Sequence, residues 1–323
     1  MSDTEEERGP MAAAARTAVR QCLELDADES LAVVTDEKRE AIGEELYLAG
    51  SEVTDDVSLV RYPVGDQHGE EPATGVAAAM AGCDAFLAPT SKSISHTRAR
   101  KEACGGGARG ATLPGITPEV FETGLAADYG AIAEECDRML AKVADAETVR
   151  VTTDLGTDIT FRPGSREWLA DTGDIAEPGS FSNLPAGEVF VAPETADGRF
   201  VVDGTMDPHG LLDEGQTITF EVEDGQVTDI DDETMRGEFE RAAETAGDAA
   251  YNLAELGIGT NTGVTELVGS VLLDEKAAGT VHIAVGDDSG IGGDTEAPIH
   301  QDGIIRNPTV EVDGEAIDLP EGV

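Results

Sequence analysis

The chain has 323 residues, and its 67 acidic residues against 21 basic ones give a formal net charge of −46. Nucleic-acid backbones and anionic lipid surfaces attract clusters of Lys and Arg, so this charge excludes nucleic acid and membrane surfaces as expected partners. Hydrophobic residues make up 40% of the chain, enough to build packed cores in two domains of ordinary size.

The first half of the sequence alternates short apolar runs with segments of helical periodicity. Strands are predicted at 31–36, 56–62, 83–89 and 110–114, and helices near 12–24, 37–49, 74–81, 96–103 and 127–145. This alternation is typical of a mostly parallel sheet with helices on both faces. We therefore expect residues 1–146 to form a doubly wound, Rossmann-like α/β domain.

A glycine-rich stretch, CGGGARG at 104–110, follows a predicted helix and precedes a predicted strand. A phosphate-binding loop has the opposite order, because its glycines follow a strand and open a helix. We therefore expect these glycines to end the helix. Arg98, Arg100, Lys101 and Arg109 lie in the same region and are expected on a solvated helix face, with a contact to an acidic surface as the alternative.

After residue 147 the pattern changes to strands of period two that are joined by turn residues. Examples are VRVTTD, ITFRPG, EVFVAP, RFVVDG and TITFEVEDGQVTDI, in which EDGQ predicts a hairpin. One helix is expected near 232–247, and strands return at 280–286 and 308–317. We therefore expect residues 147–323 to form a β-rich α+β domain.

No segment reaches the roughly 18 apolar residues of a membrane span, and the acidic N-terminus lacks the pattern of a signal peptide. A cytoplasmic location is therefore expected.

The four cysteines, Cys22, Cys83, Cys104 and Cys136, show no CxxC spacing. Buried or idle thiols are therefore expected rather than disulfides or a zinc site.

Candidate metal ligands lie in the second half. His282 occupies the apolar strand VHIAVG, and His300 and Asp302 form a His-x-Asp pair in an extended segment, where a period of two puts both on one face. Such donors suit Zn, Co, Mn or Fe. Glu188 and Glu255 lie in neutral surroundings, where a buried carboxylate would need a compensating cation. The alternative is a hydrogen-bonded core histidine and glutamates that cap turns or point outward.

The loop GDDSGIGGD at 286–294 lies between the two histidines. Such glycine-rich loops leave a cleft open and allow the backbone to approach a ligand closely. Asp287 and Asp288 are candidate ligands there, although solvated aspartates are common in so acidic a chain and solvent exposure is the main expectation.

Several blocks of the sequence resemble the leucyl aminopeptidases of the aminopeptidase T type, a thermophilic metallo-aminopeptidase family. They are HTRARKEACGGGARGATLPGIT in the first half and NLPAGEVFVAP, NLAELGIGTN, DEKAAGTVHIAVG and IHQDGIIRNPTV in the second. The similarity covers most of the chain. The resemblance implies a hydrolase that removes the N-terminal residue of a peptide substrate, and a homodimer.

The resemblance also implies a dinuclear centre with two divalent ions, Zn, Co or Mn. Its ligands would be Glu188, Glu255, Glu275, His282, His300 and Asp302. Four carboxylates can bridge and neutralise two such ions, and a water between them would attack the peptide carbonyl. Members of that family carry a Tyr shortly after the strand His, whereas residues 252–323 contain none, so no catalytic side chain is assigned beyond the ligands.

A mononuclear iron dioxygenase that opens dihydroxypyridine rings is also similar to this family and provides a second hypothesis. It uses two His and one carboxylate, for which His282, His300 and Asp302 would suffice. Glu188, Glu255 and Glu275 favour two metals and hydrolysis. A non-catalytic scaffold with the same fold is a third hypothesis.

The acidic composition predicts adaptation to high salt, since the acids are scattered along the chain and only five of the 21 basic residues are Lys. Molar salt reduces the screening length to about 3 Å, whereas in dilute buffer the carboxylates repel one another. We expect the melting temperature, measured by scanning calorimetry, to rise from dilute buffer to multimolar salt. An unchanged melting temperature would contradict this prediction.

Overall fold

The computed structural model describes residues 9–323, which form two compact units. Among these residues, unit 1 comprises 9–133 and Thr172–Ala186, and unit 2 comprises Glu134–Asp171 and Gly187–Val323. The acidic residues 1–8, on which the expected absence of a signal peptide rests, lie outside the described residues.

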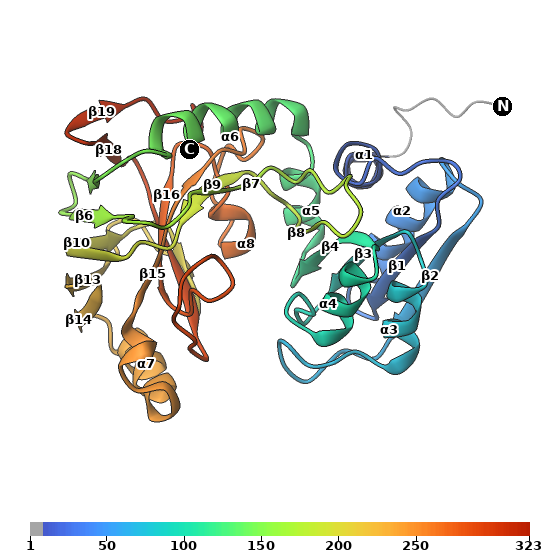
Figure 1. Ribbon diagram of the computed structural model, residues 1–323, viewed down its shortest axis with the longest axis horizontal. Helices are drawn as coiled ribbons and strands as arrows, with labels where there is room; N and C mark the ends of the chain where they lie inside the picture. Colours follow the sequence, from blue (N-terminus) through green and yellow to red (C-terminus); the bar gives the residue numbers. More distant parts are fainter. Residues whose placement is uncertain (1–8) are drawn as a thin grey trace. The chain divides into compact units, whose positions relative to one another are not determined.

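Unit 1 is built on a five-stranded parallel sheet with the strand order β2-β1-β3-β4-β8 (Figure 1). The strands are β1 (Leu31–Asp36), β2 (Val57–Tyr62), β3 (Ala85–Thr90), β4 (Arg109–Pro114) and β8 (Phe181–Asn183). All residues of β1 and β3 are buried, as expected for central strands of a parallel sheet that is covered on both faces.

The helices of unit 1 form two groups. They are α1 (Gly9–Thr17), which continues as a π-helical turn (Ala18–Cys22), α2 (Glu40–Ser51), α3 (Thr74–Ala81), α4 (Arg98–Gly105) and α5 (Pro118–Gly124). α1 packs with α2 and α5, while α3 packs with α4. Right-handed crossovers from β1 to β2 and from β2 back past β1 to β3 place α2 and α3 on opposite faces of the sheet. The predicted doubly wound arrangement is therefore confirmed.

The glycine-rich stretch after α4 ends that helix. α4 ends at Gly105, Gly106 caps it by donating its N–H to carbonyls of the last turn, and Gly107 adopts a φ of +104°, which disfavours other residues. Strand β4 begins two residues later. The expected helix termination is confirmed.

Unit 2 contains two antiparallel sheets and a two-stranded ribbon, β11-β12. The seven-stranded sheet has the order β14-β13-β10-β6-β5-β18-β19, and the five-stranded sheet has the order β17-β16-β15-β9-β7. The strands are β5 (Val149–Thr152), β6 (Asp158–Arg162), β7 (Leu169–Asp171), β9 (Glu188–Val191), β10 (Thr195–Val202), β11 (Thr205–Met206), β12 (Gly210–Leu211), β13 (Ile218–Glu223), β14 (Gln226–Ile230), β15 (Leu253–Gly259), β16 (Val281–Gly286), β17 (His300–Ile305), β18 (Thr309–Val312) and β19 (Glu315–Ile317). This sheet-rich second unit confirms the predicted fold class.

Local sequence signals account for several elements of unit 2. The predicted hairpin joins β13 to β14 through Asp224 and Gly225, both with positive φ, as a tight two-residue turn requires. Helix α6 (Tyr129–Val143) leads the chain into this unit, and α7 (Glu233–Ala246), a 3-10 turn (Gly247–Tyr251) and α8 (Val271–Asp274) follow. The ring of Phe239 on α7 packs edge-on against Phe220 of β13, which anchors the helix to the seven-stranded sheet.

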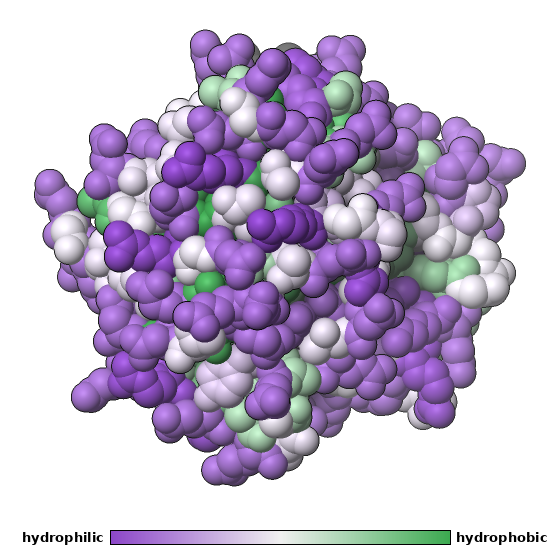
Figure 2. All heavy atoms as spheres, turned by 60° about the vertical axis from the view of Figure 1, so that its left-hand side comes forward, coloured by the Kyte–Doolittle hydropathy of each residue, from purple (hydrophilic) through white to green (hydrophobic). Residues whose placement is uncertain are grey.

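The surface agrees with the acidic composition. Figure 2 shows a face on which hydrophilic side chains predominate and hydrophobic ones are scattered.

Among residues 9–323, no helix is long and apolar enough to cross a membrane. The four cysteines form no disulfide with one another, and burial raises the pKa of Cys136 to about 12 and also raises those of Cys83 and Cys104, which disfavours the reactive thiolate forms of these three.

The expectation that Arg109 lies on a solvated helix face is wrong. Arg109 begins strand β4, its side chain is only 5% exposed, and its Nη1 and Nη2 atoms each lie 2.7 Å from an oxygen of Glu29. Its Nε also donates to the carbonyl of Leu23. A buried guanidinium needs such a bidentate carboxylate partner, because burial removes its hydration.

We expect Glu29→Gln to lower the free energy of unfolding by about 1–2 kcal/mol near neutral pH, since Arg109 loses its charged partner. The hydrogen bond from Arg109 lowers the pKa of Glu29 in the folded state. The stabilisation is therefore present above the ordinary glutamate pKa of about 4.3 and is lost as pH falls through the lowered folded value. Thermal melts from pH 7 to 3 should show the two proteins converging in acid. Glu44→Gln, an exposed site on α2, serves as the charge-matched control. A constant difference at all pH values would refute the assignment.

Candidate metal centre

Five of the predicted ligands lie on four adjacent strands of the five-stranded sheet in unit 2. Glu188 belongs to β9, Glu255 to β15, His282 to β16, and His300 and Asp302 to β17. The strand register pairs Glu188 with Gly259, Gly257 with His282, Ala284 with both Glu255 and Asp302, and Gly286 with His300. Directly paired residues share a face of a sheet, and alternate residues along a strand do so too. All five side chains therefore project from the same face.

Two backbone features adapt β15 to this role. A bulge between Leu253 and Glu255 shifts the register against β16, so that Glu255 lies opposite Ala284. Gly257 lies beneath the ring of His282, because a Cβ atom built on Gly257 would be 2.0 Å from the Nε2 atom of that histidine. Any larger residue at this position would displace the imidazole.

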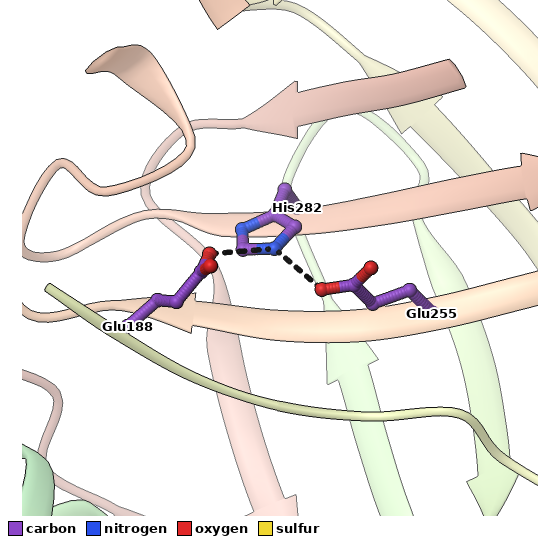
Figure 3. A group of neighbouring side chains, drawn as sticks. All are labelled: Glu188, Glu255 and His282. Atoms are coloured by element: carbon purple, nitrogen blue, oxygen red, sulfur yellow. Dashed lines mark hydrogen bonds and ion pairs between the residues drawn. The ribbon is translucent and has the colours of Figure 1, made fainter. Parts of the chain in front are cut away.

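His282 lies between two buried carboxylates, as Figure 3 shows. Its Nε2 atom is 3.3 Å from Oε2 of Glu188 and 3.3 Å from Oε1 of Glu255. The Oε2 atom of Glu188 is buried and has no hydrogen-bond partner among the described residues. Leaving an oxygen in this state is costly unless a ligand such as a cation completes the site.

The second oxygen of Glu255 extends the cluster to β17. Oε2 of Glu255 lies 3.4 Å from Nε2 of His300, and that nitrogen lies 3.6 Å from Oδ2 of Asp302. The Nδ1 atom of His300 is 2.6 Å from the carbonyl oxygen of Asp287. Because a carbonyl can only accept, Nδ1 carries a proton, which leaves Nε2 as the nitrogen that faces the carboxylates and that could bind a metal ion. Glu255 thus joins the two histidines in one cluster.

Glu275, the sixth predicted ligand, belongs to neither group of side chains able to share one ion. Those groups, within residues 9–323, are Glu188 with Glu255 and His282, and Glu255 with His300 and Asp302. Glu275 instead lies with its Oε1 atom 2.8 Å from Nζ of Lys276, and the same ammonium contacts Oε1 of Glu188.

Lys276 is part of the cluster but was not predicted from the sequence. It is one of only five lysines in the chain, and it directly follows Asp274 and Glu275 within the DEKAAGTVHIAVG block. A residue type that is rare in this chain, placed next to a predicted ligand, is the sequence feature that could have identified Lys276 as part of the site. Its burial, which decides its importance, depends on tertiary packing.

The loop aspartates have structural roles instead of ligand roles. The carboxylate of Asp288 accepts hydrogen bonds from Nδ2 of Asn252 and the backbone N–H of Thr295. The carboxylate of Asp287 accepts from Ser289 and from the N–H of Ala297. These contacts hold the loop that positions the carbonyl beside His300.

The electrostatics of the cluster favour positive charge. Burial alone would lower the pKa of His282, but its hydrogen bond to Glu255 and the charge of Glu188 raise it to about 9. Burial alone would also lower the pKa of His300. The carboxylates of Asp302 and Glu255 outweigh burial and raise this pKa. Burial raises the pKa of Glu188 to about 8, so this carboxyl depends on neighbouring cations for its charge.

The donor set fits a divalent transition metal. Two imidazole nitrogens and several carboxylate oxygens form two groups that share Glu255, and the buried Oε2 atom of Glu188 accepts no hydrogen bond. Such mixed nitrogen and oxygen sets suit Fe, Mn, Co and Zn. The residues present are therefore suited to hold a metal ion.

We expect Gly257→Ala to weaken metal binding by at least about tenfold, because the new methyl group would push the His282 ring out of position. Elemental analysis of the purified protein measures the effect, and circular dichroism checks the fold. Gly75→Ala on α3, where an added Cβ meets no atom within 4 Å, is the matched control. Equal metal content in the two variants would show that His282 is not a ligand.

Comparisons with known proteins indicate the family. The sequence profile of the NicX family, described as 2,5-dihydroxypyridine 5,6-dioxygenase, matches residues 11–320. The solved structure of 2,5-dihydroxypyridine dioxygenase from Pseudomonas putida KT2440 superposes with a TM-score of 0.77 at 20% identity, covering 97% of this chain and 96% of that one. Wild-type AmpT from Thermus thermophilus gives a TM-score of 0.68 at 19% identity, covering 95% and 96%. A comparison with curated proteins gives no match.

The family match overturns the predicted function. The likeness to aminopeptidase T holds for the fold, which AmpT shares. The interpretation as a metallo-aminopeptidase, a hydrolase that acts in proteolysis as a protease, is wrong, because the profile that matches almost the whole chain is that of a dioxygenase. The predicted ligand blocks are compatible with both activities and could not separate them. The chain belongs to the 2,5-dihydroxypyridine 5,6-dioxygenase family.

Proposed function

We propose that this protein is a ring-cleaving dioxygenase that uses one non-haem iron ion and acts on 2,5-dihydroxypyridine or a closely related hydroxylated pyridine. The observation that carries the proposal is that His282, His300 and Asp302 project from one face of β16 and β17, where Glu255 contacts both imidazoles and so links the two groups of side chains able to hold an ion. Two His and one carboxylate are the ligand set typical of non-haem iron oxygenases. Membership of the family supplies the substrate class.

Iron held by these residues would supply the redox chemistry with dioxygen that the protein side chains lack. The reaction of this class breaks one carbon–carbon bond of the ring and adds both atoms of dioxygen to the product. The electrons come from the electron-rich hydroxylated ring, so the reaction needs no external reductant.

The side chains of this unit would hold and orient such an ion. The carbonyl of Asp287 fixes the His300 ring by accepting a hydrogen bond from its Nδ1–H. Glu255 contacts both imidazoles, so its negative charge would help to balance that of an ion held by them. Strands hold these groups more rigidly than loops would, which favours a preorganised site.

Accessibility differs across the cluster. The side chain of His282 is 1% exposed, whereas that of His300 is 33% exposed. The ring substrate and dioxygen therefore have access at the β17 end of the cluster, and the β9 end is closed by protein. We propose that substrate approaches beside His300.

We expect protein loaded anaerobically with ferrous iron to retain about one iron per chain and to consume dioxygen when 2,5-dihydroxypyridine is added. Elemental analysis and an oxygen electrode measure the two quantities. His282→Ala and His300→Ala should lose both. His209→Ala is the matched control, because His209 pairs with Asp232 at the start of α7, outside the cluster.

Two results would count against the proposal. One is a protein that holds iron in the cluster but takes up no dioxygen with any hydroxylated pyridine. The other is full oxygen uptake by the His282→Ala and His300→Ala variants, which would place the chemistry elsewhere.

A further inference from the structure

Lys276 is a buried cation beside the candidate metal centre. It follows helix α8, and the residue is only 4% exposed. Its backbone is held on both sides, since its N–H donates to the carbonyl of Leu273 and its own carbonyl accepts from Asn261. The position of the side chain is therefore built into the fold and is not that of a flexible surface lysine.

The ammonium of Lys276 engages two carboxylates of the predicted dinuclear set. Its Nζ atom contacts Oε1 of Glu188 and lies 2.8 Å from Oε1 of Glu275. These two groups are not part of the ligand set proposed for iron, which is His282, His300 and Asp302. Of the six predicted ligands, Glu275 is thus held by the ammonium alone, while Glu188 contacts the ammonium through Oε1 and also belongs to one group able to hold an ion.

We propose that Lys276 is a built-in cation that takes the place of a second divalent ion and so limits the centre to one metal. The inference rests on the proposed function, because it explains how a cluster with the ligands for two ions could serve a one-iron enzyme. It assigns to Lys276 a role in metal stoichiometry and to Glu188 and Glu275 the role of its counter-ions.

Competition for the same oxygens supports one ion. Glu188, Glu255, Glu275 and Asp302 carry up to four negative charges, and Lys276 offsets one of them. One divalent ion then leaves a net charge of −1 and two leave +1, so the total charge alone does not decide between them. The second ion would compete with the ammonium for the same oxygens at close range, where like charges in a poorly hydrated site repel strongly.

Removing the ammonium should favour a second ion, because the four carboxylates would then carry a net charge of −2 with one divalent ion and zero with two. Without it, Glu188 and Glu275 are left without their cation, and uncompensated buried carboxylates are costly. Oε2 of Glu188 accepts no hydrogen bond and lies 3.3 Å from Nε2 of His282. A second divalent ion held by Glu188, in the group that it forms with Glu255 and His282, would restore the balance.

The test is metal stoichiometry. Chelator-treated wild-type protein, Lys276→Met and Lys276→Arg are incubated with excess Mn(II), passed through a desalting column into metal-free buffer of the same salt concentration, and analysed for manganese per chain. Wild type and Lys276→Arg should retain about one ion, and Lys276→Met about two. The melting temperature of Lys276→Met should rise more on metal addition than that of wild type. Lys101→Met, an exposed position on α4, is the matched control and should behave as wild type.

Retention of one ion by folded Lys276→Met would overturn the inference, as would two ions in wild type. If Lys276→Met does not fold, Lys276→Gln provides the same loss of charge with a polar side chain, and failure of both variants to fold even with metal would show that Lys276 is purely structural and overturn the inference too. The proposed function is judged separately by oxygen uptake. A change from one ion to two in a protein that never consumes dioxygen would refute the dioxygenase and leave the role of Lys276 intact.

Discussion

The need to neutralise buried carboxylates governs the second unit of this protein. Glu188 and Glu255 are each only 6% exposed and Asp302 is 8% exposed, in a sheet that otherwise buries apolar side chains. A carboxylate in such a place is unstable unless protons, an ammonium or a metal ion compensate it. The neighbouring carboxylates outweigh burial and raise the pKa values of His282 and Lys276, which favours the positively charged forms of both side chains. Metal binding, the position of Lys276 and the one-ion stoichiometry that we infer all follow from it.

The antiparallel sheet meets this demand through its register. Because facing residues on neighbouring strands share a side, four strands can bring donors from distant parts of the chain to one place without any long loop. Two local exceptions to regular geometry make room for the histidine: the bulge before Glu255 and the missing side chain at Gly257. The site is thus a property of the strands, and the adjacent loop contributes chiefly by fixing His300 through the carbonyl of Asp287.

Much of the fold follows from the sequence pattern alone. β1 and α3 coincide with the predicted segments 31–36 and 74–81, since strong apolar periodicity and clear turn residues bound them. Strand β8 and helix α5 have no predicted counterpart, because three or seven residues are too few to show a period. β8 also joins a sheet whose other strands all precede it by more than 65 positions, and such pairing is decided by tertiary packing.

The same limit applies to the site. Neutral sequence surroundings and the His-x-Asp spacing identify five side chains that converge, and the family resemblance suggests the sixth, Glu275. Neither shows that Lys276 holds Glu275 and Glu188, because a charged residue in an acidic chain is expected in solvent until its burial is known. Ligand blocks also do not distinguish hydrolysis from oxygenation, since both chemistries use the same donors and differ in the number and kind of metal ions.

The most direct test of this account is an anomalous difference map, recorded at the iron absorption edge, from crystals of the protein loaded anaerobically with ferrous iron. The account predicts a single peak bounded by His282, His300 and Asp302, with Nζ of Lys276 still in contact with Glu188 and Glu275. Two peaks in the cluster, or a peak bounded by Glu188 and Glu275 with Lys276 displaced, would contradict it.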